Sequence, residues 1–252
     1  MQIAERTYFE QYQNLIGSKI NNLVANFDFK KNADIIYQTQ ASAVYSSNIE
    51  GNSIDLNSFM NYKMSLQKVT PKKELKEIED LILAYRFSQE NELTEKNFLL
   101  IHKILTEDIL IKKFRGKYRN DKVGVFGESG LVYLAIEPEF VEASMKNFFV
   151  EIDNLLKQNI TTEEVFYFSS LIHLRFVHIH PFRDGNGRAA RLLEKWFLTQ
   201  KLGSKFWKIL AEKYYKENLV AYYNNINLGV NFYELNYDKC LPFLTMLPNS
   251  LI

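Results

Sequence analysis

Glycine and proline are scarce in this sequence, and cysteine is almost absent. The 252 residues include 10 glycines, 5 prolines and one cysteine, Cys240. So few turn-forming residues leave little to separate many short strands, which favours a mostly helical protein. A single cysteine excludes an internal disulfide and a cysteine cage for zinc, as expected of a protein in the reducing cytoplasm.

A surplus of charge is missing as well, and so are long apolar runs. Lys and Arg number 31 and Asp and Glu number 30, which gives a net charge of +1. No global field would draw the chain onto a nucleic acid or an anionic membrane, so any anion site must be local. No stretch approaches about 18 apolar residues, and the N-terminus lacks the pattern of a secretory signal. We expect no nucleic-acid partner, no membrane contact and a cytoplasmic location.

Apolar residues make up 46% of the chain, and helical spacing dominates their pattern. Residues 162–178 repeat apolar side chains at three- and four-residue steps, which predicts a helix with one buried face. Asn32 and Thr94 are suitable N-caps for helices over 32–48 and 94–108. The helices expected between residues 32 and 108 are about as polar as surface helices. Further helices are expected over residues 55–67, 72–91, 138–157, 186–201, 207–226 and about 236–247.

A different pattern begins at Lys122, where the sequence reads KVGVFGESGLVYLAI. Its three glycines and its β-branched residues predict a hairpin, with Glu128-Ser129-Gly130 as the turn between two short arms. One arm would stay exposed and could receive an extended partner segment by added-strand pairing. The apolar residues that flank the turn are Val123, Val125, Leu131 and Val132.

Residues 180–191 depart from the helical pattern and read HPFRDGNGRAAR. Pro181 must end the preceding helix, while Gly185 and Gly187 allow tight backbone geometry and the close approach of a ligand. The helix that follows presents free backbone N–H groups and the positive end of its dipole at this point. The segment therefore predicts a hole for an anion.

The side chains of this segment suit a nucleoside triphosphate. Asp184 is a hard oxygen ligand for magnesium, and Asn186 is a neutral donor. Arg188 and Arg191 lie three residues apart on one helix face and would each contact a different phosphate. An imidazole has an unperturbed pKa of about 6.5, so His180 can remove a proton from an attacking hydroxyl at neutral pH.

The same segment resembles the signature of the Fic family, HPFx(D/E)GNGRxxR, at every defining position. The resemblance extends over most of residues 90–230. It implies an all-α fold, namely a helical bundle with a small β-hairpin flap before the active-site loop. It also implies transfer of AMP from ATP to a Ser, Thr or Tyr hydroxyl of a target protein. We accordingly expect an N-terminal helical region (1–90), a Fic core domain (91–230) and a C-terminal helical tail packed on the core (231–252).

The resemblance assigns roles to the residues of the signature. His180 would deprotonate the target hydroxyl, and Asp184 would hold Mg²⁺ between the α- and β-phosphates. The hairpin, with its residues Val123, Val125, Leu131 and Val132, is similar to the flap that aligns target polypeptides in this family. The nucleotide and its anion hole would involve Arg183, Gly185, Asn186, Gly187, Arg188 and Arg191.

A second family element is the run Ser46-Ser47-Asn48-Ile49-Glu50-Gly51-Asn52, which is similar to the inhibitory motif (S/T)xxxE(G/N). Its position before the core resembles the subgroup with an N-terminal inhibitory helix, here over about 32–50. The resemblance implies that Glu50 pairs with Arg191 and keeps the γ-phosphate from its productive pose, since a carboxylate and a triphosphate compete for one guanidinium. Ser46 lies one turn before Glu50, could hydrogen-bond to it, and opens the motif that Glu50 and Gly51 close.

Several alternatives stay open. The same site could remove AMP from a modified target, with Glu50 orienting water, or the chain could be a nucleotide-binding signalling module without turnover. The donor could be another nucleotide, and the protein could be a homodimer. A zinc site at His173, His178 and His180 is rejected, because the last two bracket a helix end and no fitting Cys or carboxylate lies beside them. His173 is expected in the core, hydrogen-bonded to backbone.

Overall fold

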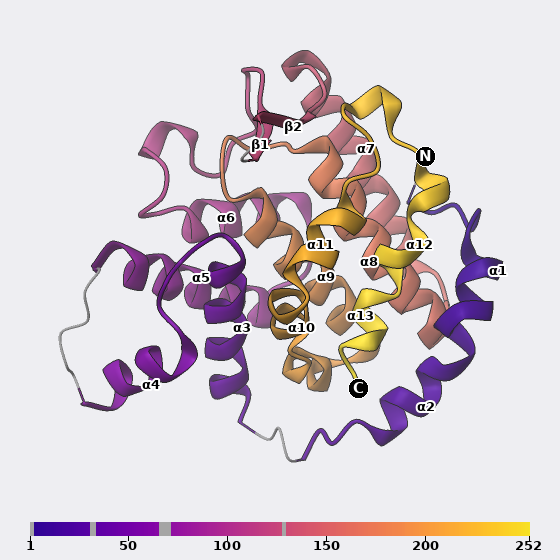
Figure 1. Cartoon of the computed structure of the whole chain (residues 1–252), viewed down its shortest axis with the longest axis horizontal. Coiled ribbons are helices and arrows are strands. Elements are labelled where there is room, and N and C mark those ends of the chain that lie inside the picture. The colour runs from indigo at the N-terminus through magenta and orange to yellow at the C-terminus, as the bar shows by residue number, and fades with distance from the viewer. Residues whose placement is uncertain (1–2, 31–33, 66–71, 128–129) are drawn as a thin grey trace.

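The computed structural model describes residues 3–30, 34–65, 72–127 and 130–252. The expected all-α fold with a small β-hairpin is confirmed (Figure 1). The helices in chain order are α1 (Phe9–Tyr12), α2 (Ser18–Asn26), α3 (Ile35–Ile49), α4 (Leu56–Ser65), α5 (Lys72–Glu90), α6 (Glu95–Leu105), α7 (Pro138–Lys157), α8 (Thr162–Ile179), α9 (Asn186–Leu202), α10 (Ala211–Glu217), α11 (Leu219–Ile226), α12 (Leu241–Leu244) and α13 (Met246–Asn249). The strands are β1 (Gly124–Gly127) and β2 (Gly130–Leu134).

α8 and α9 pack against each other at the centre of the molecule (Figure 1). The sequence predicts one buried face for α8, and this was wrong, because nearly all of its side chains are buried. α7, α2 and α12 cover the faces that α9 leaves open. Polar residues on those faces tolerate burial because they find partners: Ser169 donates to the carbonyl of Val165, and Ser170 donates to that of Leu244.

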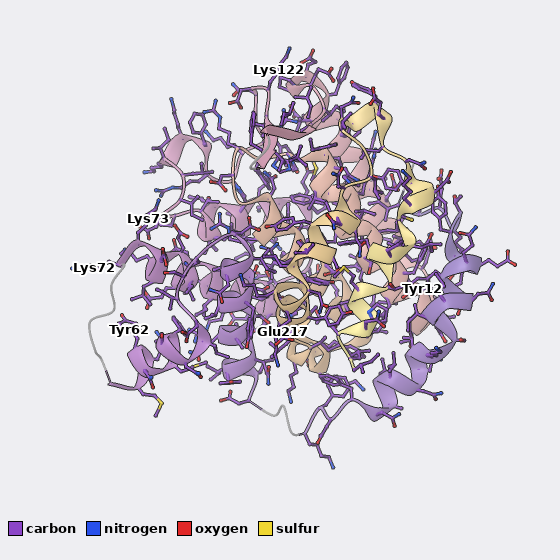
Figure 2. The ribbon with its side chains drawn as sticks, viewed as in Figure 1. Tyr12, Tyr62, Lys72, Lys73, Lys122 and Glu217 are labelled. Carbon is purple, nitrogen blue, oxygen red and sulfur yellow. The ribbon has the colours of Figure 1, made fainter. Side chains whose placement is uncertain are left out.

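The first 30 residues add helices that the sequence pattern did not predict. α1 continues through a π-helical turn, Gln13–Gly17, into α2. Tyr12 is fully buried, and its ring centroid lies 5.2 Å from that of Tyr167 on α8 (Figure 2). Aromatic contact with α8 thus holds this N-terminal segment on the core.

α3 begins two residues later than a cap at Asn32 would allow. Asp34 is the N-cap, and its carboxylate accepts hydrogen bonds from the backbone N–H groups of Ile36 and Tyr37. Asn32 itself lies outside the described residues. The helix ends at Ile49, with Glu50 as its C-cap.

The middle of α3 is buried, although its polarity predicted a surface helix. It packs between α5 and α10, and four polar residues from four helices meet there. Lys195 donates to Ser42 (2.6 Å) and to Glu212 (2.7 Å), and Tyr85 donates to Glu212 (2.6 Å). The side chains of Lys195 and Glu212 are 3% and 1% exposed. We call these residues the Ser42 cluster; because each charge has a partner, the cluster can fix α3 inside the protein.

The hairpin pairs β1 with β2 in antiparallel register, from Gly124 opposite Leu134 to Gly127 opposite Gly130. Gly130 therefore belongs to β2 and not to the turn, while Glu128 and Ser129 lie outside the described residues. The N–H of Leu134 donates to the carbonyl of Val230 (2.9 Å), so this end of β2 is already paired on its outer side. Among the described residues, β2 is the sole strand partner of β1.

Two helices expected near the C-terminus are interrupted. In place of a helix over 207–226 the chain forms a 3₁₀ turn (Ser204–Lys208), α10 and α11, and the break falls at Asn218. The side-chain amide of Asn218 donates to the carbonyl of Tyr214 and competes with regular helix bonding there. The helix expected over 236–247 is divided into a 3₁₀ turn and the single turns α12 and α13. No helix of the described residues is both long and apolar enough to cross a membrane.

Candidate active site

The loop between α8 and α9, residues 180–185, is held in a tight conformation. α8 ends at His180, which adopts left-handed backbone angles (φ +51°), and Gly185 does the same at φ +78° before α9 starts. Asn186 closes the loop, because its amide accepts from the N–H of Phe182 (2.9 Å) and donates to the carbonyl of Phe182 (2.8 Å). One of the two amide hydrogens of Asn186 is thus used within the loop, and the contact with phosphate that the sequence predicts stays a prediction.

His102 on α6 stabilises the loop through its ring and both of its ring nitrogens. Its ring stacks on the buried ring of Phe182, with centroids 3.5 Å apart. Nδ1 accepts a hydrogen bond from the N–H of Gly116 (2.9 Å), which leaves the proton on Nε2 to be donated to the carbonyl of Asp184 (3.0 Å). Burial lowers the pKa of His102 to about 4, so this neutral form persists at pH 7.

Arg119 clamps the loop from the other side. Its guanidinium donates to the carbonyls of His180 (2.7 Å), Asp121 (2.7 Å) and Ile136 (2.5 Å), and its own backbone N–H donates to the carbonyl of Pro181 (2.9 Å). The sequence assigned no role to His102, and it placed Arg119 only in the run before the hairpin that is similar to the family's flap. Neither stands near the motif in the chain, and a buried arginine cannot be told from a surface one by spacing alone.

His180 is oriented with one ring nitrogen free. Nδ1 lies 3.2 Å from the carbonyl of Val177, which can only accept, so Nδ1 carries the proton and Nε2 has a free lone pair. Burial lowers the pKa of His180 to about 4; the charge of Arg119 acts in the same direction, while the hydrogen bond to Val177 and the carboxylates of Glu50 and Asp184 oppose it. At pH 7 the neutral fraction of this ring is therefore larger than it would be with a pKa of about 6.5.

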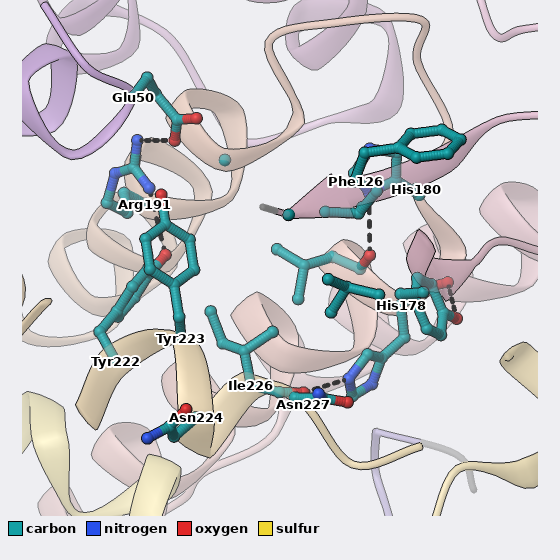
Figure 3. Close-up of a pocket in the computed structure, with 16 residues that line it drawn as sticks. Glu50, Phe126, His178, His180, Arg191, Tyr222, Tyr223, Asn224, Ile226 and Asn227 are labelled. Atoms are coloured by element: carbon teal, nitrogen blue, oxygen red, sulfur yellow. Dashed lines mark hydrogen bonds and ion pairs between the residues drawn. The ribbon is translucent and has the colours of Figure 1, made fainter. Parts of the chain in front are cut away.

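Arg191 on α9 is fully buried and makes four hydrogen bonds, of which Figure 3 shows those to Glu50 and Tyr222. Nη2 donates to Glu50 Oε1 (2.6 Å) and to the carbonyl of Ser46 (2.9 Å), Nε donates to Ser46 Oγ (2.9 Å), and Nη1 donates to the hydroxyl of Tyr222 (3.1 Å). The expected contact between Glu50 and Arg191 is present. Ser46 differs from expectation, because its hydroxyl binds Arg191 and not Glu50.

Glu50 reaches into the site because two glycines make room for it. A Cβ atom on Gly187 would lie 2.2 Å from Glu50 Oε1, so any other residue there would displace the carboxylate. Gly51 follows with φ +92°, a conformation that turns the chain sharply after α3. Burial alone would raise the pKa of Glu50, but the charges of Arg191 and Arg188 outweigh it and lower that pKa, so the carboxylate is ionised at neutral pH.

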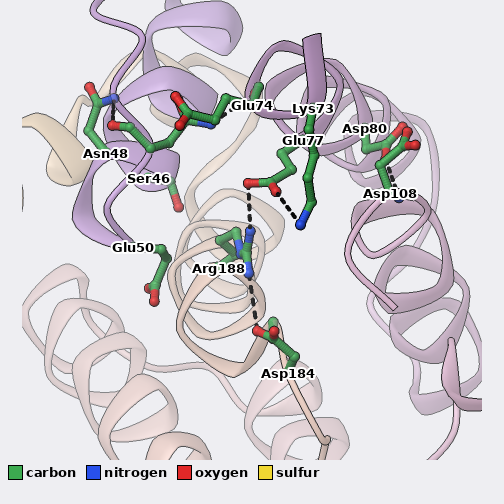
Figure 4. Close-up of polar contacts among 12 residues, drawn as sticks. Ser46, Asn48, Glu50, Lys73, Glu74, Glu77, Asp80, Asp108, Asp184 and Arg188 are labelled. Atoms are coloured by element: carbon green, nitrogen blue, oxygen red, sulfur yellow. Dashed lines mark hydrogen bonds and ion pairs between the residues drawn. The ribbon is translucent and has the colours of Figure 1, made fainter. Parts of the chain in front are cut away.

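Arg188 also has carboxylate partners (Figure 4). Its guanidinium lies 3.2 Å from Asp184 Oδ1 and 3.7 Å from Glu77 Oε2 on α5, and its side chain is 8% exposed. Asp184 is 52% exposed, so its carboxylate faces solvent as well as Arg188. Two arginines near a helix N-terminus oppose the dipole, and here nearby carboxylates offset both charges.

A cavity of about 520 Å³ adjoins the loop, α9, the hairpin and α11 (Figure 3). Three residues of the signature line this cavity, namely His180, Gly187 and Arg191. Glu50 lines it as well. Val125 and Val132 line it too, whereas Val123 and Leu131 do not. Its remaining lining residues are Phe126, Gly127, Tyr133, Val177, His178, Tyr222, Tyr223, Asn224, Ile226 and Asn227.

Comparison with known proteins gives this cavity a family context. A sequence model of the Fic/DOC family matches residues 92–198. Residues 92–198 thus form a domain of the Fic family. It is 28% identical over 200 residues to "Protein adenylyltransferase Fic" of Nematostella vectensis, a match over 74% of this chain and 43% of that protein. It is 29% identical over 163 residues to the protein of the same name from Drosophila erecta, over 62% and 31%. The Fic chain thus spans less than half of the length of these relatives.

Solved structures show the same fold. A Fic family protein from Desulfovibrio desulfuricans G20 superposes with a TM-score of 0.78 at 20% identity, over 95% of this chain and 71% of that one. A Fic domain containing signaling protein from Bacteroides thetaiotaomicron VPI-5482 gives a TM-score of 0.67 at 21% identity, over 97% and 90%. At this identity the likeness establishes the Fic fold alone.

Arg183 of the signature and His173 on α8 have partners other than those that the sequence predicted. Arg183 was expected at the nucleotide, but its guanidinium pairs with both carboxylate oxygens of Asp121 (3.1 and 2.9 Å) and lies 3.4 Å from the ring centroid of Phe114. It does not line the cavity. His173 is buried as expected, but side chains and not backbone surround it: Tyr222 is 3.0 Å from Nε2.

Among the described residues, no three Cys, His, Asp or Glu side chains gather around a common point. His178 is enclosed by the hydroxyl of Tyr237 (2.8 Å) and the carbonyl of Ile226 (2.8 Å). The sequence predicted no site role for the residues on and just after α11 that line the cavity, which are Tyr222, Tyr223, Asn224, Ile226 and Asn227. Their functional position becomes visible only when α11 is seen beside α9.

Proposed function

We propose that this Fic protein transfers AMP from ATP to a Ser, Thr or Tyr hydroxyl of a target protein. The observation that carries the proposal is the shared cavity: a neutral imidazole with a free Nε2, a helix N-terminus, a buried arginine and an exposed hairpin all border one space of about 520 Å³. Relatives named protein adenylyltransferase support the same reaction.

The transfer step follows from the orientation of His180. The target hydroxyl attacks the α-phosphorus of ATP, and its proton passes to Nε2 of His180. A new P–O bond forms to the target, the bond between the α-phosphorus and the bridging oxygen breaks, and pyrophosphate leaves. Reactions of this kind depend mostly on positioning and on offsetting negative charge, which this site offers.

The phosphates would lie against the N-terminus of α9. Gly185 and Gly187 keep the backbone accessible there, and Arg188 and Arg191 supply positive charge one turn further along. Asp184, half exposed and ionisable, would hold a magnesium ion whose charge offsets that of the phosphates. With no cluster of three protein ligands in the described residues, such an ion would take its other ligands from phosphate and water.

The hairpin is the proposed flap that docks the target. Phe126 is 73% exposed and Leu131 is 53% exposed, so apolar side chains face solvent beside the cavity. The outer edge of β1 is the more open of the two, because Val230 already pairs with β2 at Leu134. An extended target segment could add to β1 as a third strand and bring its hydroxyl to His180.

Glu50 would inhibit the proposed reaction, and we call its ion pair with Arg191 the brake. Glu50 occupies the guanidinium of Arg191 from within the cavity, so a triphosphate and this carboxylate exclude each other on charge as well as on space. We propose that the activity is low while the pair is intact and rises when Glu50 moves away.

Removal of AMP is the second candidate reaction. An ionised carboxylate that shares a cavity with His180 could orient water toward a modified target, and Glu50 is in that position. A module that binds nucleotide without turnover is less well supported, because binding alone has no use for the free Nε2 of His180.

One experiment tests enzyme against binder. Wild-type protein, Glu50→Gly and Glu50→Gly/His180→Ala are incubated with Mg²⁺ and α-³²P-labelled ATP, and labelled protein is counted. We expect label in Glu50→Gly and none in the double variant. Equal labelling of the two would overturn the transferase proposal, and a parallel incubation with AMP-modified target shows whether wild type releases AMP.

A further inference from the structure

Arg191 is held from two opposite sides. Glu50 approaches it from α3, at the cavity, while Tyr222 on α11 binds its other terminal nitrogen (Figure 3). Behind Tyr222 lie His173 on α8 and Glu194 on α9, neither of which borders the cavity. These three residues, Tyr222, His173 and Glu194, form what we call the Arg191 anchor.

The hydrogen bonds of the anchor can run in one direction only. A guanidinium donates and cannot accept, so the oxygen of Tyr222 accepts from Arg191 (3.1 Å). The hydroxyl proton of Tyr222 is then directed to Nε2 of His173 (3.0 Å), which must be the unprotonated nitrogen. Nδ1 of His173 therefore carries the ring proton.

A buried negative charge ends the chain. His173 Nδ1 lies 3.2 Å from Glu194 Oε2, near enough for electrostatic attraction although the N–H does not point at the oxygen. Glu194 also accepts from the hydroxyl of Tyr215 (2.9 Å). Arg191, Tyr222 and Glu194 are each 1% exposed and His173 is fully buried, so water screens none of these contacts.

Arg191 thus has two carboxylates, and they differ in one respect. Glu50 is 31% exposed and shares the cavity with the proposed nucleotide, so it can leave. Glu194 is inside the core and cannot. We propose that His173 and Glu194 are positioning residues, which act through Tyr222 to keep Arg191 correctly oriented for the outer phosphates of ATP once Glu50 has moved.

This inference rests on the proposed function, and its test therefore starts from Glu50→Gly. His173→Phe keeps the ring volume but cannot accept from Tyr222, whereas His173→Gln can place its Oε1 where Nε2 was. Isothermal titration calorimetry measures the affinity of each variant for ATP and for AMP, which lacks the phosphates that Arg191 would bind. Tyr12→Phe is the matched control, because Tyr12 is equally buried and its hydroxyl has no hydrogen-bond partner among the described residues.

We expect His173→Phe to weaken ATP binding about tenfold, the loss typical of a hydrogen bond to a charged group, and to leave AMP binding unchanged. His173→Gln should stay within about threefold of its parent, and Tyr222→Phe with His173→Phe should be no worse than His173→Phe alone, since both act through one contact. Glu194→Gln should weaken ATP in the same selective way, and serves if His173→Phe does not fold.

Three results would overturn the inference. One is His173→Phe binding ATP as tightly as its parent. Another is an equal loss of ATP and AMP affinity, which indicates general damage to the core. The third is Tyr12→Phe showing the same selective loss. If the Glu50→Gly parent binds no ATP at all, the proposed function itself fails, and that outcome is distinct from the other three.

Discussion

Replacing Glu50 by glycine is the sharpest test of the proposed brake. Glu50 contributes one of four hydrogen bonds to Arg191, and the other three come from Ser46 and Tyr222. The variant should therefore free one face of the guanidinium without releasing the arginine. It should also remove the carboxylate that stands 2.2 Å from the position of a Cβ on Gly187, where phosphate would approach.

The size of the effect can be estimated from this contact. A hydrogen bond between charged groups contributes about 1.5–3 kcal/mol, and the 31% exposure of Glu50 favours the lower part of that range. A difference of about 1.5–2 kcal/mol corresponds to roughly ten- to thirtyfold in the population that can bind ATP productively. We expect the initial rate of AMP incorporation, measured with α-³²P-labelled ATP, to rise by that factor.

Matched variants make the result specific. Glu217→Gly removes another carboxylate from a helix end, where Glu217 is 59% exposed and pairs only weakly with Lys213 (3.6 Å), and it should leave the rate unchanged. Arg191→Ala in the Glu50→Gly background should erase the gain, because both changes act on one contact. If Glu50→Gly incorporates no more AMP than wild type, the brake does not exist, and loss of AMP removal in that variant would instead assign Glu50 to the reverse reaction.

Other consequences of the site can be checked directly. His180→Ala should abolish transfer while the ATP affinity measured by calorimetry stays nearly unchanged, and a variant that keeps most of its rate would contradict the role of base. Asp184→Ala and Arg188→Ala should each weaken Mg-ATP binding together with turnover, so an unchanged affinity would count against both assignments. Val125→Pro, in the strand proposed to receive the target, should remove target labelling but preserve ATP binding, and normal labelling would dismiss β1 as a docking strand. Burial lowers the pKa of His180 to about 4 and that of His178 to about 3 in the folded protein. In the unfolded chain the same imidazoles take up protons below about pH 6.5, while in the folded protein they are still neutral. Stability should thus be constant above about pH 6.5 and fall by about 2 kcal/mol per imidazole at pH 5, and equal urea midpoints at pH 7.5 and pH 5 would refute this.

The sequence predicts the chemistry of residues 180–191 because that chemistry is contiguous. A turn, two glycines, a base and two arginines follow one another, so no tertiary information is needed to place them together. The start of α7 was equally accessible, since Pro138 occupies its first turn. The flap could be expected from its glycines, although its register depends on pairing that spacing alone does not fix.

The residues that hold the site in place could not be predicted in this way. Arg119 and His102 reach the loop from 61 and 82 residues away in the chain, and Tyr222 reaches Arg191 from 31. The directions of the Asn186 and Arg183 side chains likewise depend on partners brought by folding. Periodicity reports which face of a helix is apolar, but it does not report which polar groups will find partners inside the core.

The Ser42 cluster determines how the proposed brake can be released. Moving α3 away as a rigid body would remove Ser42 from the buried Lys195–Glu212 pair and expose the core. Such a change would cost several kcal/mol, which is more than binding of a small ligand readily offsets. Glu50, by contrast, is the C-cap that follows the last residue of α3, Ile49, and it is itself followed by a left-handed glycine. Release of the proposed brake would then require the movement of a single carboxylate just after α3, and an effector that biases the rotamers at residues 50–52 would be enough to set the rate.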